Sequence, residues 1–193
     1  MAVFIAQLKQ YQIDVVADVR SVPYSKVFHG YHQEAIKVEL KRNDITYVYL
    51  GAELGPRSKL PEHYDEHEHG QVQFDRLMQS PLFAEGVERL YAGMEKGFTI
   101  AMMCAEKDPA TCHRSLLIGY FLARHRQSDQ GAALDILHID HAGQIEKQTA
   151  LEQRFCDIHA LETDLFMSAE ERATRAYQQQ LKNTSYRKPN VSE

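Results

Sequence analysis

The densest group of reactive side chains follows an apolar run at residues 98–104. Its members are Cys104, Glu106, Lys107, His113 and Arg114. Cys104 is a candidate nucleophile, because a neighbouring lysine, a histidine and a helix N-terminus each lower the pKa of a thiol. The alternative for Cys104 is an inert, buried thiol at a strand end. Glu106 is a candidate general acid or base, and its alternative is a solvated carboxylate that pairs with Lys107.

The spacing around Cys104 disfavours two classes of cysteine enzyme, the phosphatases and the rhodaneses. In both, the loop after the cysteine ends in an arginine, and the corresponding position here is Ala110. The set Cys104, Cys112 and His113 lacks the paired two-residue cysteine spacing of a zinc site and a clear fourth ligand. We therefore expect neither a metal nor a cofactor from the sequence.

Asp108 and Pro109 predict the start of a helix, since aspartate caps helices and proline suits their first position. The N–H groups at that helix end would bind an anion, although Asp108 would occupy some of them. Lys107, His113 and Arg114 are candidate anion ligands around it. The alternative for His113 is a helix-surface histidine that is hydrogen-bonded to a backbone carbonyl.

A second group of polar side chains lies at the end of the apolar run at residues 14–20. Asp18 interrupts this run, and a carboxylate inside a sheet needs a partner, for which Arg20 is the nearest candidate. One interpretation is a structural ion pair that orders the following loop. The other is a guanidinium that binds a carboxylate or phosphate, with Ser21 as a further donor and Asp18 as a catalytic group.

Residues 62–69 form an acidic, histidine-rich stretch in which His63 and His67 have a spacing that binds zinc on a helix. A solvated surface tract is the more economical interpretation. Such tracts also bind metals adventitiously, so metal affinity alone would not identify a site here.

The elements that position these side chains alternate between helix and strand. Apolar runs predict strands, and apolar residues at helical spacing predict helices between them. The expected strands are 14–20, 45–50, 98–104 and 134–139, and the residues from 145 on are helical in pattern, ending in a helix over 169–181. Ser168 and Glu171 fit a capping box at the start of that last helix. The pattern predicts a three-layer α/β fold whose mostly parallel sheet is flanked by helices. In such sheets, ligands bind beyond the carboxyl ends of the strands.

Composition bounds the class of protein. The 193 residues are 44% apolar and 25% charged, with a net charge of -5, and we expect one domain over 1–182. Its core would span 3–140, its C-terminal helices 145–181, and 183–193 would be a disordered tail. Three cysteines and no apolar run of membrane-spanning length favour a cytoplasmic protein without disulfides or membrane segments.

The two strand-end motifs, with Leu54-Gly55 between them, resemble the domain of unknown function 488 family. The resemblance covers about residues 4–139 and implies a three-layer α/β domain in a bacterial or archaeal cytoplasm, but no reaction. Its recurrent residues map onto Asp18, Arg20, Ser21, Pro23, Cys104, Glu106, Lys107, Cys112, His113 and Arg114.

Members of the family typically begin with a strand that ends in a threonine-isoleucine-glycine-histidine type of sequence. This chain has no such strand ahead of its first helix. We expect a misassigned start codon or a naturally shortened chain, with the absent strand placed beside those ending at Arg20 and Cys104.

These features together predict a site for a phosphate-bearing small molecule or nucleotide at the strand ends, where Cys104 or Glu106 would carry out hydrolysis. The alternative is a non-catalytic module that binds nucleic acid or a protein partner. Its basis is the segment 172–193, which holds five basic residues and one acid. The overall negative charge disfavours binding of nucleic acid by bulk charge.

Overall fold

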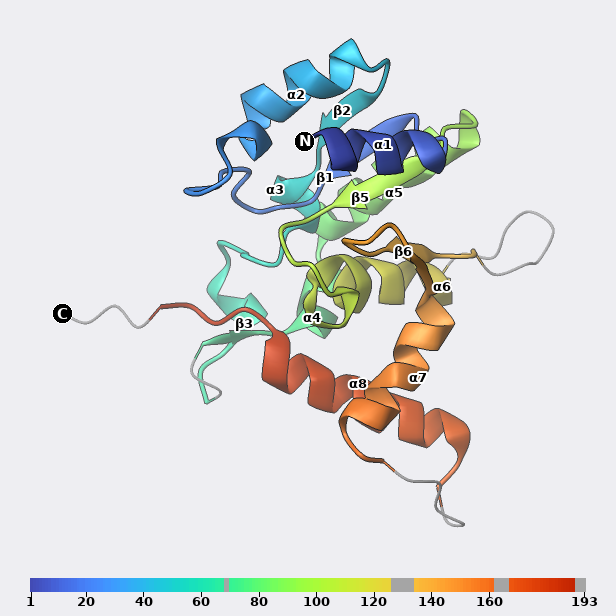
Figure 1. Ribbon diagram of the computed structural model, residues 1–193. Helices are drawn as coiled ribbons and strands as arrows, with labels where there is room; N and C mark the ends of the chain where they lie inside the picture. Colours follow the sequence, from blue (N-terminus) through green and yellow to red (C-terminus); the bar gives the residue numbers. More distant parts are fainter. Residues whose placement is uncertain (68–69, 126–133, 162–166, 190–193) are drawn as a thin grey trace. The chain divides into compact units, whose positions relative to one another are not determined.

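The computed structural model describes residues 1–67, 70–125, 134–161 and 167–189. Its internal contacts divide the chain into two compact units, each with its own helices and strands (Figure 1). The first unit comprises Met1–Lys59 and Asp75–Ala105, and the second comprises Leu60–Phe74 and Glu106–Glu193. The single domain expected over 1–182 stays a prediction.

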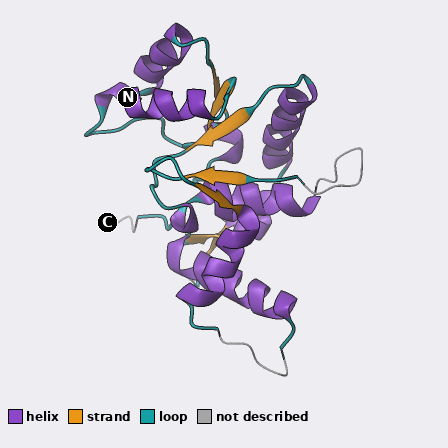
Figure 2. Cartoon of the chain, turned by 45° about the vertical axis from the view of Figure 1, so that its right-hand side comes forward, coloured by secondary structure: helices purple, strands orange, loops and turns teal. Residues whose placement is uncertain are grey.

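The first unit is built around a parallel sheet with the strand order β2-β1-β5. β1 is Val15–Asp18, β2 is Thr46–Tyr49 and β5 is Ile100–Met103. β1 is buried along its whole length, in agreement with its apolar sequence. The register pairs Asp18 with Tyr49 and with Met103, so the carboxyl ends of the three strands meet at one edge. Figure 2 shows the strands in orange among the purple helices.

Besides the 3₁₀ turn η1 (His29–Tyr31), four α-helices lie wholly in the first unit. They are α1 (Ala2–Gln10), α2 (Gln33–Arg42), α3 (Gly51–Leu54) and α5 (Pro81–Glu95). Leu8 of α1 and Ile36 and Leu40 of α2 pack with Val16 of β1 in one apolar cluster. α5 contacts both α3 and β5. The expected α/β class is confirmed, and the three-layer arrangement stays a prediction.

The second unit is mostly helical. Its helices are the 3₁₀ turns η2 (Pro61–His63) and η3 (Pro109–Thr111), the π-helix η4 (Arg114–Gly119), α6 (Tyr120–His125), α7 (Gln148–Ile158) and α8 (Ala169–Thr184). Its strands are β3 (Tyr64–Asp65), β4 (Gln71–Val72), β6 (Leu137–Ile139) and β7 (Ile145–Lys147). The remaining helix, α4 (Phe74–Met78), lies at the boundary of the two units. α7 and α8 pack against each other, and both contact η3.

The strand expected at 134–139 does not extend the parallel sheet. β6 instead pairs antiparallel with β7, whose residues 145–147 were expected to be helical. The reason is a tight turn in which the Asp140 carboxylate accepts hydrogen bonds from the backbone N–H groups of Ala142 and Gln144. Gly143 supports the turn with a φ of +82°.

The C-terminal segment is more ordered than its polar composition indicated. α8 begins at the expected capping box of Ser168 and Glu171 and continues to Thr184. Beyond it, the backbone of Val72 donates to Tyr186, and that of Lys188 donates to Gly70. The tail expected to be disordered is therefore paired with β4 as far as residue 188, and residues 190–193 lie outside the described part of the chain.

In the part of the chain that the structure describes, no helix combines the length and the apolar character needed to cross a membrane.

Candidate functional site

A buried ion pair stands at the carboxyl end of β1. The Asp18 side chain is fully buried, and Arg20 is 8% exposed. Arg20 donates from Nε to Oδ1 of Asp18 at 2.9 Å and from Nη2 to Oδ2 at 2.7 Å. The backbone N–H of Arg20 also donates to Oδ1, at 3.1 Å. The expected pairing of Asp18 with Arg20 is therefore present, and it is bidentate.

Tyr47 of β2 completes this network from the neighbouring strand. Its hydroxyl donates to Oδ2 of Asp18 at 2.7 Å. Burial and this hydrogen bond to a carboxylate raise the pKa of Tyr47 well above its ordinary range. Burial alone would lower the pKa of Arg20, but the hydrogen bonds and charge of Asp18 raise it overall. The network therefore keeps Tyr47 neutral and Arg20 charged.

The loop after β1 lies close to both ends of α3, and a glycine at each end makes this possible. A Cβ atom on Gly51 would lie 2.0 Å from the backbone oxygen of Arg20. One on Gly55 would lie 2.3 Å from Oγ of Ser21. That Oγ accepts a hydrogen bond from the backbone N–H of Arg57 at 3.1 Å. Ser21, a candidate donor in the sequence, is thus fixed in place beside Arg20.

A second charged network lies in the second unit, around Asp108. The Asp108 side chain caps η3 by accepting from the backbone N–H of Ala110 at 2.9 Å. Arg154 of α7 donates from Nη2 to Asp108 at 2.8 Å and to Glu146 at 2.8 Å. The hydrogen bonds from Arg154 lower the pKa of Asp108, and the charge of Arg114 adds to this effect.

The helix expected to start at Asp108 begins later. Asp108 and Pro109 open only the three-residue turn η3, and Cys112 then adopts an extended backbone with φ -110° and ψ 134°. The longer helical run starts at His113. Because the Asp108 carboxylate accepts from the backbone N–H of Ala110, it occupies a donor at the helix end where the anion was expected. Anion binding at this position stays a prediction.

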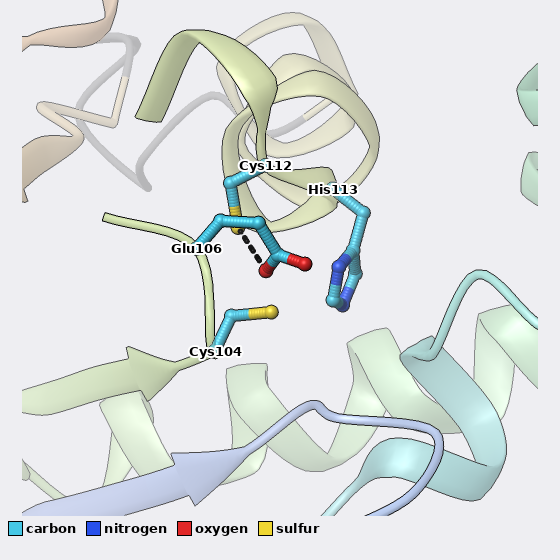
Figure 3. Close-up of side chains that lie close together, drawn as sticks. All are labelled: Cys104, Glu106, Cys112 and His113. Atoms are coloured by element: carbon cyan, nitrogen blue, oxygen red, sulfur yellow. Dashed lines mark hydrogen bonds between the residues drawn. The ribbon is translucent and has the colours of Figure 1, made fainter. Parts of the chain in front are cut away.

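Three potential metal ligands of the second unit lie close together next to η3. The Glu106 carboxylate, the Cys112 thiol and the His113 ring have ligand atoms within 4.8 Å of one another. The Cys112 thiol donates to Oε2 of Glu106 at 3.5 Å. Figure 3 shows the Glu106 carboxylate between the Cys112 sulfur and the His113 ring, with Cys104 as the fourth side chain drawn.

The expected site residues divide between the two units. Asp18, Arg20, Ser21 and Cys104 belong to the first unit, and Glu106, Lys107, His113 and Arg114 belong to the second. Cys104 is half-buried, Lys107 is exposed, and His113 is buried. In the structure, Asp18 is hydrogen-bonded to Arg20. Glu106 lies close to Cys112 and His113.

Over its described residues, the histidine-rich stretch is not one continuous helix, because the 3₁₀ turn η2 ends at His63 and the strand β3 follows at Tyr64–Asp65. His63 lies in η2 and is buried, and His67 is exposed. Position 69 lies outside the described residues. The helical spacing that would bring His63 and His67 onto one face is therefore absent here.

Tyr47 and Arg154 were missed by the sequence analysis. The apolar run at residues 45–50 predicts a strand, but it does not show which side chain meets Asp18. Arg154 is separated from Asp108 by 46 positions, and no local pattern links the two.

The model of the family described as domain of unknown function DUF488 matches residues 1–121. The chain belongs to this family. The match includes both strand-end motifs, as the sequence resemblance indicated. Searches of the curated proteins and of the solved structures found no match.

Proposed function

We propose that the first unit binds an anionic group, in the form of a phosphate-bearing small molecule or nucleotide, through Arg20. The observation that carries this proposal is the orientation of the guanidinium group. Asp18 takes the Nε and Nη2 hydrogen bonds, and within the described residues Nη1 has no hydrogen-bond partner. A guanidinium group whose Nε and Nη2 are held by a carboxylate, and whose Nη1 has no hydrogen-bond partner, can donate from Nη1 to a phosphate or carboxylate oxygen.

The position of Arg20 supports the proposal. It lies two residues beyond the last residue of β1, the central strand, at the edge where the carboxyl ends of three parallel strands meet. Ligands of open parallel sheets bind at that edge. Ser21 follows directly, and its hydroxyl can donate to the same anion while its oxygen accepts from Arg57.

The Asp18–Arg20 pair is neutral as a whole. A bound anion would therefore be held mainly by directed hydrogen bonds and less by attraction to a net positive charge. We therefore expect selectivity for a phosphate group over chloride. Asp18 is a positioning residue in this proposal, since its oxygens are occupied by Arg20 and Tyr47.

Hydrolysis stays a prediction. Cys104 belongs to the same unit, and its charge contributes to the raised pKa of Arg20. This supports a place for Cys104 beside the bound anion as a nucleophile. The roles of Glu106 in catalysis and of Lys107, His113 and Arg114 in anion binding also stay predictions, as does the nucleic-acid or partner-binding alternative.

The test is calorimetric titration of the full chain with inorganic phosphate and with a nucleoside monophosphate. We expect the Arg20→Lys variant to bind at least about tenfold more weakly, because lysine lacks the planar donor pair. The Arg42→Lys variant is the matched control, since Arg42 lies in an exposed ion pair with Glu39. It should bind as the parent does.

Two results would overturn the proposal. One is a parent protein that binds neither ligand, and the other is an Arg20→Lys variant that binds both as tightly as the parent. Circular dichroism of each variant establishes that it is folded. If Arg20→Lys does not fold, the Ser21→Ala variant takes its place, with weaker phosphate binding as the expected result.

A further inference from the structure

The second unit contains a set of side chains that anion binding by Arg20 does not require. Cys112 is fully buried, His113 is 6% exposed, and Glu106 lies on the surface beside them. Their sulfur, nitrogen and oxygen ligand atoms lie within 4.8 Å of one another. We propose that Glu106, Cys112 and His113 bind one zinc ion.

The distances within the set suit a tetrahedral ion. Zinc binds thiolate sulfur at about 2.3 Å and carboxylate oxygen at about 2.0 to 2.2 Å, so the two atoms lie about 3.5 Å apart across a tetrahedral angle. The separation of Cys112 Sγ from Glu106 Oε2 is 3.5 Å. Both atoms can therefore bind the same ion with little movement.

The types of ligand also favour zinc. A thiolate, an imidazole and a carboxylate are the three side-chain ligands that zinc uses in proteins. A Cys112 thiolate and a Glu106 carboxylate carry two negative charges, which a divalent ion neutralises. Without the ion, the same pair is a thiol that donates its proton to the carboxylate. Binding therefore replaces that hydrogen bond with two bonds to the ion.

The backbone that carries the ligands is held in place by groups outside the set. Asp108 caps η3, and Arg154 of α7 anchors Asp108. Gln180 of α8 donates to the backbone oxygen of Ala110 at 2.6 Å, and Ser115 donates to that of Cys112 at 2.8 Å. Such supporting contacts keep a ligand set in position before the metal binds.

The change of backbone conformation between Cys112 and His113 explains how neighbours in sequence serve one ion. Cys112 is extended, whereas His113 has helical angles of φ -63° and ψ -22°. Adjacent side chains therefore point to the same space, as Figure 3 shows.

The experiment is zinc and cobalt titration of the full chain under reducing conditions. We expect about one equivalent of zinc to remain after desalting, and the cobalt form to show thiolate-to-metal charge-transfer absorption. Cys112→Ser and Glu106→Gln should weaken zinc binding at least about tenfold. Glu106 is exposed, so Glu106→Gln keeps the test valid if Cys112→Ser fails to fold.

Two control variants separate this site from other metal-binding side chains. Cys156 is a buried free cysteine of the same unit outside the ligand set, and Cys156→Ser should bind zinc as the parent does. His67→Ala should also leave zinc binding unchanged, since His67 belongs to the histidine-rich stretch. The proposal is overturned if the parent retains no zinc, if Glu106→Gln retains it as the parent does, or if His67→Ala loses it.

Discussion

The Asp18 carboxylate is the residue on which the candidate anion site depends. It accepts hydrogen bonds from the backbone and side chain of Arg20 and from the hydroxyl of Tyr47. A fully buried carboxylate is stable only with such partners. The same contacts that satisfy Asp18 also fix the orientation of Arg20.

Replacing Asp18 should therefore cost more stability than replacing one of its donors. We expect Asp18→Asn to lower the free energy of unfolding by about 3 to 5 kcal/mol, because it leaves the buried charge of Arg20 without a counter-charge. Tyr47→Phe removes one hydrogen bond to a charged group and should cost about 1.5 to 3 kcal/mol. Urea unfolding of both variants measures the difference. Equal losses would contradict this account of the network.

The titration of His138 should account for part of the dependence of the free energy of unfolding on pH. Burial lowers its pKa, which its hydrogen bond with Gln148 and the charge of Glu146 only partly oppose, while the charges of Arg114 and Arg154 lower it further. The unfolded chain, with a histidine pKa of about 6.5, takes up a proton that the folded chain resists. Stability contributed by neutral His138 is present above that pKa and is lost as the pH falls below it.

The test is the free energy of unfolding from about pH 7.5 to about pH 5.5, across the pKa of an unfolded histidine. His138→Gln removes the titrating ring and should show a shallower fall than the parent. His125→Gln changes an exposed histidine and should follow the parent. The same slope in His138→Gln and the parent would contradict the assignment.

At the scale of elements, the close approach of α3 to the loop after β1 positions the backbone around the candidate anion site. Gly51 begins α3, and a Cβ there would meet the Arg20 carbonyl and the ring of Tyr49. We expect Gly51→Ala to lower the free energy of unfolding by about 1 to 3 kcal/mol, as overpacking does, and to weaken phosphate binding. At Gly30 a Cβ would be 3.8 Å from Met1, so Gly30→Ala is the control for both measurements. Parent-like phosphate binding by Gly51→Ala would show that this approach does not shape the site.

The sequence predicts elements well where a local rule decides them. The apolar run at 14–20 gave β1, and the Ser168 capping box gave the start of α8. It failed at Asp108, where a capping residue and a proline open only a short turn. It failed also at 145–147, because a turn at Asp140 decides the pairing of β6 and β7. In both cases the outcome depends on the backbone conformation of the residues at and after a turn, and the spacing of apolar residues does not determine that conformation.

At the scale of the whole molecule, the two candidate sites belong to different compact units. Arg20 lies in the first unit, and the Glu106, Cys112 and His113 set lies in the second. The sequence identified both motifs, since polar residues followed apolar runs. It could not show that Tyr47 meets Asp18 or that Arg154 meets Asp108, because these contacts join positions 29 and 46 residues apart.

Ligand-dependent hydrogen exchange should separate the two sites. Phosphate should slow amide exchange near residues 18–21 of the first unit, because a ligand stabilises the state that binds it. Zinc should slow exchange near residues 106–116 of the second. Mass spectrometry of peptides from the full chain reads both effects. Phosphate protection confined to the second unit would contradict the assignment of the anion to Arg20.

The central claim is that an anion binds Nη1 of the Arg20 guanidinium group, and nuclear magnetic resonance of arginine side chains tests it most directly. During a phosphate titration, the side-chain nitrogen signals of Arg20 should shift and saturate, while those of the exposed Arg42 should not follow the same curve. Signals of Arg20 that stay unchanged at saturating phosphate would contradict the claim.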